Sequence, residues 1–235
     1  MSHRCLPVLL VSVPLLLALT PAHGQTTEPY NDRPSAVRVR FGEFEPEGDS
    51  IYWDQREIDF TGSVDDFADS IYAVDFVHML TERWGVMASV SYYEGQDRQA
   101  FRDFVDDRGA DILHDTSLEV ATLNVGMVFH LLRRDAAVSP YIGGGFGFYG
   151  YDLEESGDFI DFDTFEVFPG TFTADGDAFG AYLLVGLEVS LTAQVSIFGE
   201  ARWHDADDEL EGDFREFGTI DLGGQEYSAG LSFRF

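Results

Sequence analysis

The chain has 235 residues, and its 43 acidic residues against 14 basic ones give it a formal net charge of −29. All of the basic residues are arginine, because the sequence contains no lysine. Phosphate groups repel such a chain, which argues against nucleic acid or an anionic phosphate surface as a direct partner.

The first 24 residues have the layout of a secretory signal peptide, with a short basic start, an apolar stretch and small residues leading to Gly24. We predict that this segment is cleaved after Gly24, that residues 25–35 form an N-terminal periplasmic segment, and that residues 36–235 form one domain. The only cysteine, Cys5, lies before the apolar stretch. The predicted mature chain therefore has no thiol, which excludes disulfides, thiolate catalysis and cysteine-metal sites.

The rest of the chain has the composition of an all-β protein. No apolar run is long enough for a transmembrane helix, which excludes a helical membrane protein. Glycine, aromatic and β-branched residues instead recur in blocks in which apolar and polar side chains alternate, as they do in strands. The eight blocks span residues 36–44, 69–80, 83–95, 117–131, 140–152, 178–191, 194–205 and 220–235. An even number of strands is typical of a closed antiparallel barrel.

The connections between the blocks alternate in length. Those after the second, fourth and sixth blocks are short, whereas those after the first, third, fifth and seventh are long and acidic. The long connections span residues 45–68, 96–116, 153–177 and 206–219. This alternation predicts an eight-stranded antiparallel transmembrane β-barrel with short periplasmic turns and long acidic extracellular loops. The alternative is a soluble eight-stranded barrel of lipocalin type, in which the apolar faces point inward.

If the apolar faces point to lipid, the interior of the barrel receives a balanced set of charges. Its members are Arg38, Arg40, Asp75, Glu188, Glu200, Arg202, Glu226 and Arg234. Buried charges must be paired, and the interior of an eight-stranded barrel is just wide enough for its own side chains. We therefore expect a plugged, charged lumen without a wide pore. Phe198 breaks the pattern, because it is an apolar residue at an inward position.

Three stretches resemble the small outer-membrane β-barrel family that includes the transmembrane domain of outer-membrane protein A. They are "SPYIGGGFGFYGYD" at 139–152, "FGEARW" at 198–203 and the terminal "YSAGLSFRF". In that family the terminal aromatic strand is read by the outer-membrane assembly machinery. The resemblance implies this role for Tyr227, Leu231, Phe233 and Phe235. The sequence does not contain the peptidoglycan-binding domain of that protein, so a tether to the cell wall is not implied.

A few members of this architecture are enzymes that act on lipid A, so the histidines bear on catalysis. His204 lies beside Asp205, but no serine follows within the next twenty residues and the His-x-Ser-Asn arrangement of a lipid A deacylase is missing. His78, His114 and His130 are scattered over the ends of different blocks, without metal spacing. We predict no enzymatic activity and no cofactor.

The acidic loops raise a separate hypothesis. Calcium and magnesium take carboxylate ligands, but no loop matches a spaced Asp-x-Asp-x-Asp-Gly pattern, so a solvated set of like charges is the favoured interpretation. Phenylalanines recur within these loops and indicate that the strands continue above the membrane or that the loops pack on each other. They are Phe60, Phe67, Phe101, Phe104, Phe159, Phe162, Phe165 and Phe168.

These observations predict a monomeric, non-enzymatic barrel of the bacterial outer membrane that contributes to envelope structure or surface contact. Its expected partners are outer-membrane lipids and lipopolysaccharide, the assembly machinery and, at the acidic loops, divalent cations. A narrow channel or small-molecule transporter is the first alternative, and a lipid A-modifying enzyme is the second.

Overall fold

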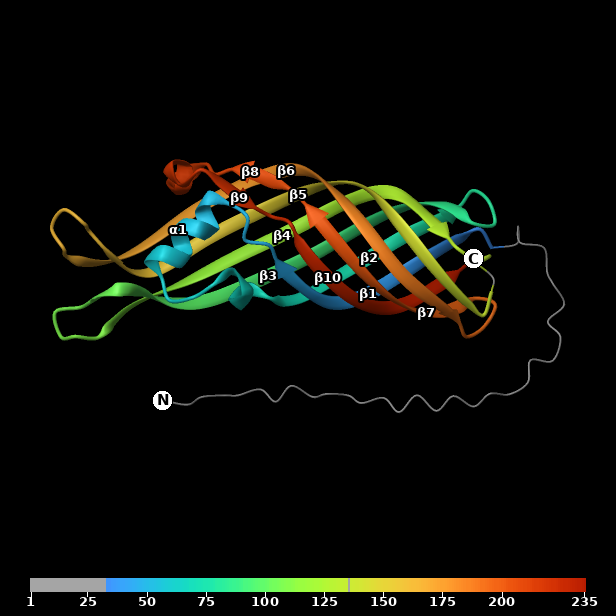
Figure 1. The fold of residues 1–235 in the computed structure, drawn as a ribbon, viewed down its shortest axis with the longest axis horizontal. Coiled ribbons are helices and arrows are strands. Elements are labelled where there is room, and N and C mark those ends of the chain that lie inside the picture. Colours follow the sequence, from blue (N-terminus) through green and yellow to red (C-terminus); the bar gives the residue numbers. More distant parts are fainter. Residues whose placement is uncertain (1–32, 135) are drawn as a thin grey trace.

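A computed structural model describes residues 33–134 and 136–235 of the chain, and within them eight long strands close into an antiparallel barrel (Figure 1). The predicted signal peptide, Cys5 and most of the predicted 25–35 segment lie outside the described residues. The barrel strands are β1 (Ser35–Pro46), β2 (Asp69–Met79), β3 (Trp84–Val105), β4 (Asp111–His130), β5 (Val138–Ile160), β6 (Val167–Ser190), β7 (Val195–Asp205) and β10 (Gly224–Arg234). The predicted eight-stranded antiparallel β-barrel is confirmed.

The first and last strands close the ring. β1 pairs with both β2 and β10, and each remaining strand pairs with its neighbours along the chain. At the closure, the Phe235 amide donates to the Ser35 carbonyl at 2.9 Å and the Ser35 amide donates to the Phe235 carbonyl at 3.2 Å. Each of the eight described barrel strands thus has a partner on both sides, which removes the main route to edge-to-edge aggregation.

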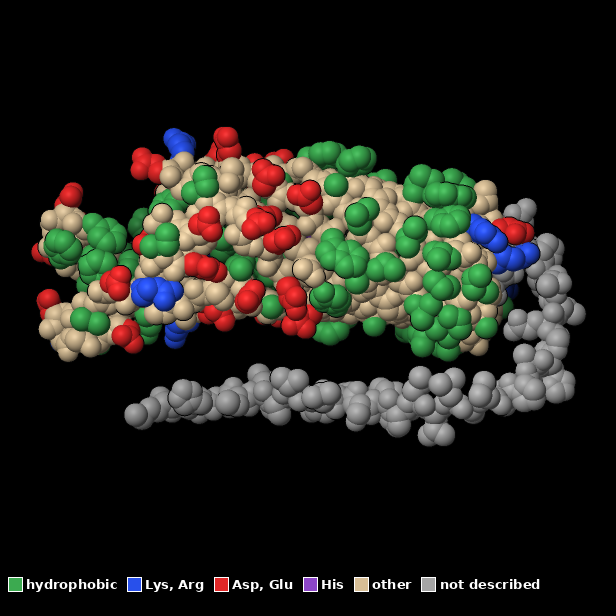
Figure 2. All heavy atoms as spheres, in the orientation of Figure 1, with side chains coloured by type: hydrophobic (Ala, Val, Ile, Leu, Met, Phe, Trp, Pro, Cys, Tyr) green, Lys and Arg blue, Asp and Glu red, His purple; other side chains and the backbone are tan. Residues whose placement is uncertain are grey.

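The two faces of the strands differ as the alternation predicts. On β1, Val39 and Phe41 are half exposed on the outside, whereas Arg38 and Arg40 are buried inside. Similar residues on the other strands form a band of apolar side chains around one half of the barrel, and acidic side chains begin where this band ends (Figure 2). The soluble alternative with inward apolar faces is therefore wrong at this level of the barrel.

The two ends of the barrel are unequal. One end, here called the turn end, carries the short connections at residues 80–83, 131–137 and 191–194. The opposite end, the loop end, extends far beyond the apolar band (Figures 1 and 2). Both chain termini of the described barrel, Ser35 and Phe235, lie at the turn end.

Two of the four predicted loops are mostly strand, which corrects the predicted boundaries. β3 and β4 are joined by a turn at residues 106–110, and β5 and β6 by a turn at 161–166, so that most of the expected loop residues pair as hairpins. Phe159 faces Phe168 across the second hairpin. The loop phenylalanines indicate such a continuation of the strands, but the acidic composition conceals where the strands end.

The first and fourth connections fold over the mouth of the barrel. The first contains α1 (Ile51–Asp59) and the short 3₁₀ helix η2 (Val64–Phe67), where the sequence predicts only a loop. The fourth contains β8 (Asp207–Glu209), the 3₁₀ helix η3 (Gly212–Phe217) and β9 (Thr219–Asp221). The predicted block 220–235 is thus divided, since its first residues pair with β8 and the barrel strand begins at Gly224. No helix among the described residues is long and apolar enough to cross a membrane.

The helix α1 turns one face toward the barrel interior. Tyr52, Trp53 and Arg56 lie on this face and are buried, whereas Ile51 and Ile58 on the other side are exposed. The Trp53 indole nitrogen donates to the Asp221 carbonyl at 3.1 Å and so fastens the helix to β9. A nine-residue helix is too short to be stable alone in water, so these tertiary contacts hold it.

Candidate functional site

The centre of the lumen holds three arginines and three acids in one contiguous cluster, here called the central charge cluster. All of its members are buried, and they come from five strands: β1, β2, β7 and β10 carry the charges, and β3 supplies a serine. The charged members are Arg38, Arg40, Asp75, Glu200, Arg202 and Glu226. Because the formal charges of three arginines and three acids cancel, the cluster places no net charge in the barrel.

Asp75 is the acid that lies within ion-pair distance of all three arginines. Its carboxylate lies 3.2 Å from Arg40 Nε, 3.4 Å from Arg202 Nη2 and 3.9 Å from Arg38 Nε. The Ser89 hydroxyl adds a hydrogen bond to Asp75 Oδ1 at 2.6 Å. A fully buried carboxylate would be costly on its own, and these four partners offset that cost.

Glu200 forms the second centre of the cluster. It accepts from Arg38 Nη2 at 3.0 Å and from the Tyr141 hydroxyl at 2.8 Å, and it also pairs with Arg202. Tyr141 stands on β5, on the opposite side of the ring from β1. The contacts therefore reach across the lumen from wall to wall.

Glu226 completes the cluster on the side of the loop end. It pairs with Arg40, and its Oε2 lies 3.6 Å from His204 Nε2. The other ring nitrogen of His204 hydrogen-bonds the Tyr149 hydroxyl at 3.0 Å. The histidine considered as a catalytic candidate is thus part of the lumen packing.

The inward-pointing Phe198 also belongs to this cluster. Its ring lies under the Arg38 guanidinium, with 3.6 Å between the ring centroid and Arg38 Cζ. An aromatic face attracts a cation, most strongly where water is absent. The residue that breaks the alternation in the sequence therefore supplies a further partner for a buried arginine.

The remaining two predicted lumen residues form a separate pair near the turn end. Arg234 Nη2 lies 2.7 Å from Glu188 Oε1. Arg134, which the sequence places in a turn, approaches Glu188 from the other side, with its Nε 4.0 Å from Oε2. Sequence reasoning missed Arg134, because it lies outside any alternating block. The structure thus brings six of the eight predicted residues into one cluster and two into another.

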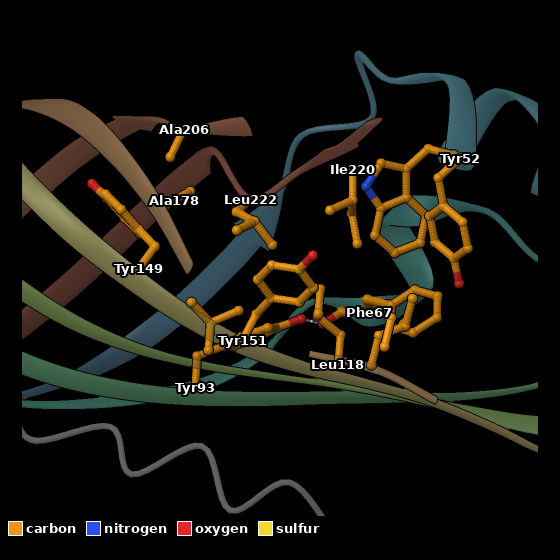
Figure 3. Close-up of a cluster of buried hydrophobic side chains, with 14 of the residues drawn as sticks. Tyr52, Phe67, Tyr93, Leu118, Tyr149, Tyr151, Ala178, Ala206, Ile220 and Leu222 are labelled. Carbon is orange, nitrogen blue, oxygen red and sulfur yellow. Dashed lines mark hydrogen bonds between the residues drawn. The ribbon is translucent and has the colours of Figure 1, made fainter. Parts of the chain in front are cut away.

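Above the central charge cluster the lumen is filled by an apolar cluster, here called the plug (Figure 3). The plug combines side chains of α1, η2, the fourth connection and the barrel wall. Its buried members are Phe44, Tyr52, Trp53, Phe67, Ile71, Tyr93, Leu118, Val120, Tyr149, Tyr151, Leu153, Ala174, Ala178, Ala206, Leu210, Phe214, Ile220 and Leu222. Trp53 packs edge-on against Tyr52 and Phe67, with ring centroids 5.0 and 5.1 Å apart.

One buried polar link anchors α1 across the mouth. Arg56 pairs with Glu155 of β5 and donates to Gln99 of β3 and Thr116 of β4, both at 2.7 Å. The Tyr52 hydroxyl donates to the same Glu155 carboxylate at 2.9 Å. One helix is thereby tied to three strands, although the sequence offers no indication that Arg56 and Glu155 meet.

The predicted assembly residues lie on the outer face of β10 or, in the case of Phe235, directly after it. Tyr227, Leu231, Phe233 and Phe235 are all exposed, and the apolar side chains of β1 continue their surface. They do not contribute to the lumen. Their position is that of lipid-facing side chains in a barrel of this kind.

The other three histidines among the described residues hydrogen-bond serines near the turn end or lie at the loop end. His130 Nδ1 lies 2.9 Å from the Ser139 hydroxyl, and His78 Nδ1 lies 3.0 Å from the Ser35 hydroxyl. Ser139 has no exposed surface. Within the described ranges, no group of three or more His, Cys, Asp or Glu side chains is arranged to hold a metal ion.

Comparison with known proteins gives a family and a set of similar folds. Residues 16–235 match the family described as outer membrane protein beta-barrel domain. The outer membrane protein OprG from Pseudomonas aeruginosa is 13% identical, with 86% of this chain and 95% of that chain covered and a TM-score of 0.56. A major outer membrane protein from Thermus thermophilus is 12% identical, with 87% and 100% covered and a TM-score of 0.50. No curated protein matches the chain in sequence.

The central charge cluster predicts that replacing a buried arginine lowers the free energy of unfolding much more than replacing an exposed one. Arg202→Met removes one partner from a fully buried set and leaves Asp75 and Glu200 under-compensated, so it should lower the free energy of unfolding by about 3–5 kcal/mol. Arg98→Met removes one partner of the solvent-exposed Arg98–Asp115 pair, in which both side chains are more than half exposed. Exposed pairs contribute little, so this control should unfold like the parent chain.

Urea unfolding of the purified protein in detergent micelles, followed by tryptophan fluorescence, measures both variants. If both substitutions lower the free energy of unfolding equally, or if Arg202→Met does not lower it, the pairing described for the lumen is contradicted.

Proposed function

The chain belongs to the outer-membrane β-barrel protein family and resides in the bacterial outer membrane, and from that premise we propose that it is a non-enzymatic barrel with a closed lumen. On this proposal the turn end faces the periplasm and the loop end faces outward. The barrel serves to hold a folded surface structure at the loop end, which contributes to envelope structure or to contacts at the cell surface.

The observation that carries this proposal is the filling of the lumen in two successive layers. The central charge cluster crosses the barrel from Arg38 on β1 to Tyr141 on β5, and the plug lies above it. A solute that passed through would have to break buried ion pairs, each of which is costly to leave without a partner. It would then have to displace Trp53 and Phe67, which are almost completely buried.

The same layers argue against the two alternatives. A narrow channel requires a water-filled path, whereas an eight-stranded barrel leaves room only for its own side chains. A lipid A-modifying enzyme requires a nucleophile that outer-leaflet lipid can reach. The two serine–histidine pairs of the described residues, Ser139–His130 and Ser35–His78, both lie near the turn end, which on this proposal faces the periplasm. No described feature favours either alternative over a closed barrel.

The outer surface supports lipid and lipopolysaccharide as partners. The apolar band has the position of the membrane core, and acidic side chains gather just beyond it (Figure 2). Glu43, Asp152 and Asp177 are exposed acids of the barrel strands β1, β5 and β6. Carboxylates at this level face the head groups of the outer leaflet. Divalent cations would bridge these carboxylates to lipopolysaccharide phosphates, because hard cations take oxygen ligands from both. The eight described barrel strands form a ring without a free edge, which favours a monomer.

The closed lumen predicts the electrical behaviour of the protein. Insertion of the purified full chain into a planar lipid bilayer should produce no steady conductance, because the ion-paired centre leaves no continuous water path. A general porin reconstituted in the same bilayer serves as the positive control. A reproducible open-channel current that scales with the amount of inserted protein would contradict the proposal.

The terminal strand predicts a defect that appears in cells and not in vitro. Phe235→Ala keeps the backbone bonds to Ser35 but removes an outward side chain that we assign to recognition by the assembly machinery. We expect several-fold less folded protein in the outer membrane, measured as the fast-migrating unboiled band on a denaturing gel. Phe146→Ala removes an equally exposed outward phenylalanine elsewhere on the barrel and should assemble normally.

Both variants should refold into lipid vesicles at the same rate and to the same extent. If Phe235→Ala refolds poorly in vesicles, its effect is on the stability of the barrel and the assignment to the machinery fails. If the two variants assemble equally well in cells, the assignment fails as well.

A further inference from the structure

The loop end contains a cavity of about 220 Å³ that the closed lumen does not use. It lies between α1, the extended β3–β4 and β5–β6 hairpins and η3. Its aromatic lining residues are Tyr52, Phe60, Phe101, Phe159, Phe162, Phe168, Phe172, Phe214 and Phe217. At about 30 Å³ for each water molecule, the cavity has the volume of roughly seven waters, which suits a ligand with a single ring and a short side chain.

The aromatic rings form a continuous wall rather than isolated patches. Phe60 and Phe101 lie 4.8 Å apart between centroids, and Phe159 and Phe172 lie 4.7 Å apart, both edge to face. Phe168 and Phe217 remain about two-fifths exposed, so the cavity is open to the outside. An enclosed aromatic surface with an open side is typical of a small-molecule site.

The polar lining residues of the cavity carry an excess of negative charge. Three of them are the acids Asp59, Glu155 and Asp213, and one is the basic residue Arg56. Arg56 is already neutralised by its contact with Glu155. The remaining carboxylates, together with the net charge of −29 on the whole chain, favour a cation in this cavity and disfavour an anion.

Arg56 shows how these rings accommodate positive charge. Its guanidinium carbon lies 5.2 Å from the Phe67 ring centroid, 5.6 Å from that of Phe60 and 5.8 Å from that of Tyr52. Cation–π contacts of this kind favour organic cations, since their apolar body also fits an aromatic wall. Phe60 and Tyr52 line the cavity as well, so the rings that surround Arg56 are available to a ligand on their cavity side.

A buried histidine lies behind the aromatic wall. His114 is almost completely buried, its ring lies 4.2 Å from Phe60 and 5.5 Å from Phe159, and neither ring nitrogen has a hydrogen-bond partner among the described residues. Burial, with the positive charge of Arg56, lowers the pKa of His114 to about 4, so this side chain is neutral at pH 7. A neutral imidazole at this position does not repel a cation bound in the cavity.

We propose that the aromatic cavity at the loop end binds a small organic cation, a primary or quaternary amine attached to one apolar ring. The ring packs against Phe101, Phe159 and Phe172, and the ammonium group lies toward Asp59 and Asp213. This site goes beyond the proposed function, because it does not depend on whether the lumen conducts ions. Failure of the conductance prediction would leave it standing, and its own failure would leave the closed lumen standing.

Three probes of nearly equal size separate the contributions of charge and ring. They are 2-phenylethylammonium, the neutral 2-phenylethanol and the anion 3-phenylpropanoate, each titrated calorimetrically into the purified full chain in a non-ionic detergent. We expect the ammonium compound to bind at least about tenfold more tightly than either of the others, since charge attraction adds to the shared apolar contact. Empty micelles correct for partitioning of the probes.

Two variants on one helix locate the site. Asp59→Asn removes a lining carboxylate. It should weaken the binding of 2-phenylethylammonium about three- to tenfold and leave the binding of 2-phenylethanol unchanged, because only the cation is attracted by the carboxylate charge. Asp54→Asn removes an exposed carboxylate of α1 that does not line the cavity, and it should bind like the parent chain. Phe101→Ala, which removes a ring of the cavity wall, should weaken the binding of 2-phenylethylammonium and of 2-phenylethanol by similar factors. The fast-migrating unboiled band confirms that each variant is folded.

Three results would overturn the proposal. The first is equal binding of the three probes, which would leave only an apolar cavity without charge selectivity. The second is an equal effect of Asp54→Asn and Asp59→Asn, which would indicate general attraction to an acidic surface. The third is no binding of the ammonium compound at millimolar concentration.

Discussion

A narrow barrel in a membrane cannot leave a charge unpaired inside it, and this constraint shapes the whole molecule. Asp75 is completely buried, yet three arginines and the Ser89 hydroxyl surround it. The strands that carry these partners must stay in register, because a shift of one residue would send every charged side chain to the lipid. The pairing in the lumen and the register of the wall therefore depend on each other.

The loop end is built on this rigid base. Above the apolar band the strands of the two central hairpins continue as paired sheet, and α1 with the fourth connection fills the space between them (Figures 1 and 3). The interior changes at this level from ion pairs to aromatic side chains. The polar link of Arg56 and Glu155 fixes the helix laterally, while the plug provides the buried apolar area that stabilises it.

The division of charge between the inside and the outside explains the acidic composition of the chain. The central charge cluster contains as many arginines as acids, so it contributes nothing to the excess. Acidic side chains gather on the outer surface beyond the apolar band, where water solvates them (Figure 2). Acidic loops and a neutral lumen are thus two separate features of one sequence, and only the first accounts for the net charge of −29.

Much of the barrel could be predicted from the sequence, because its strands obey a period of two that is local in the chain. Residues 37–41 already assign arginine to the inside and aliphatic or aromatic residues to the outside. The folded loop end could not be predicted in the same way. Arg56 and Glu155 are 99 residues apart, and the inward Glu155 looks like one more solvated acid in an acidic stretch. α1 has only nine residues, so its helical period does not stand out in the sequence. Its role in closing the mouth of the barrel is visible only from the burial of Trp53 in the structure.

The measurement that tests the closed lumen most directly is the chemical accessibility of its centre. In a chain that carries Cys5→Ser, a single cysteine is placed either at Ser89, beside Asp75, or at Ala110, in the exposed turn between β3 and β4. A small charged methanethiosulfonate reagent is then applied to the folded protein. A closed lumen predicts rapid labelling of Ala110→Cys and no labelling of Ser89→Cys until the barrel is unfolded. Labelling of both positions at similar rates would contradict it.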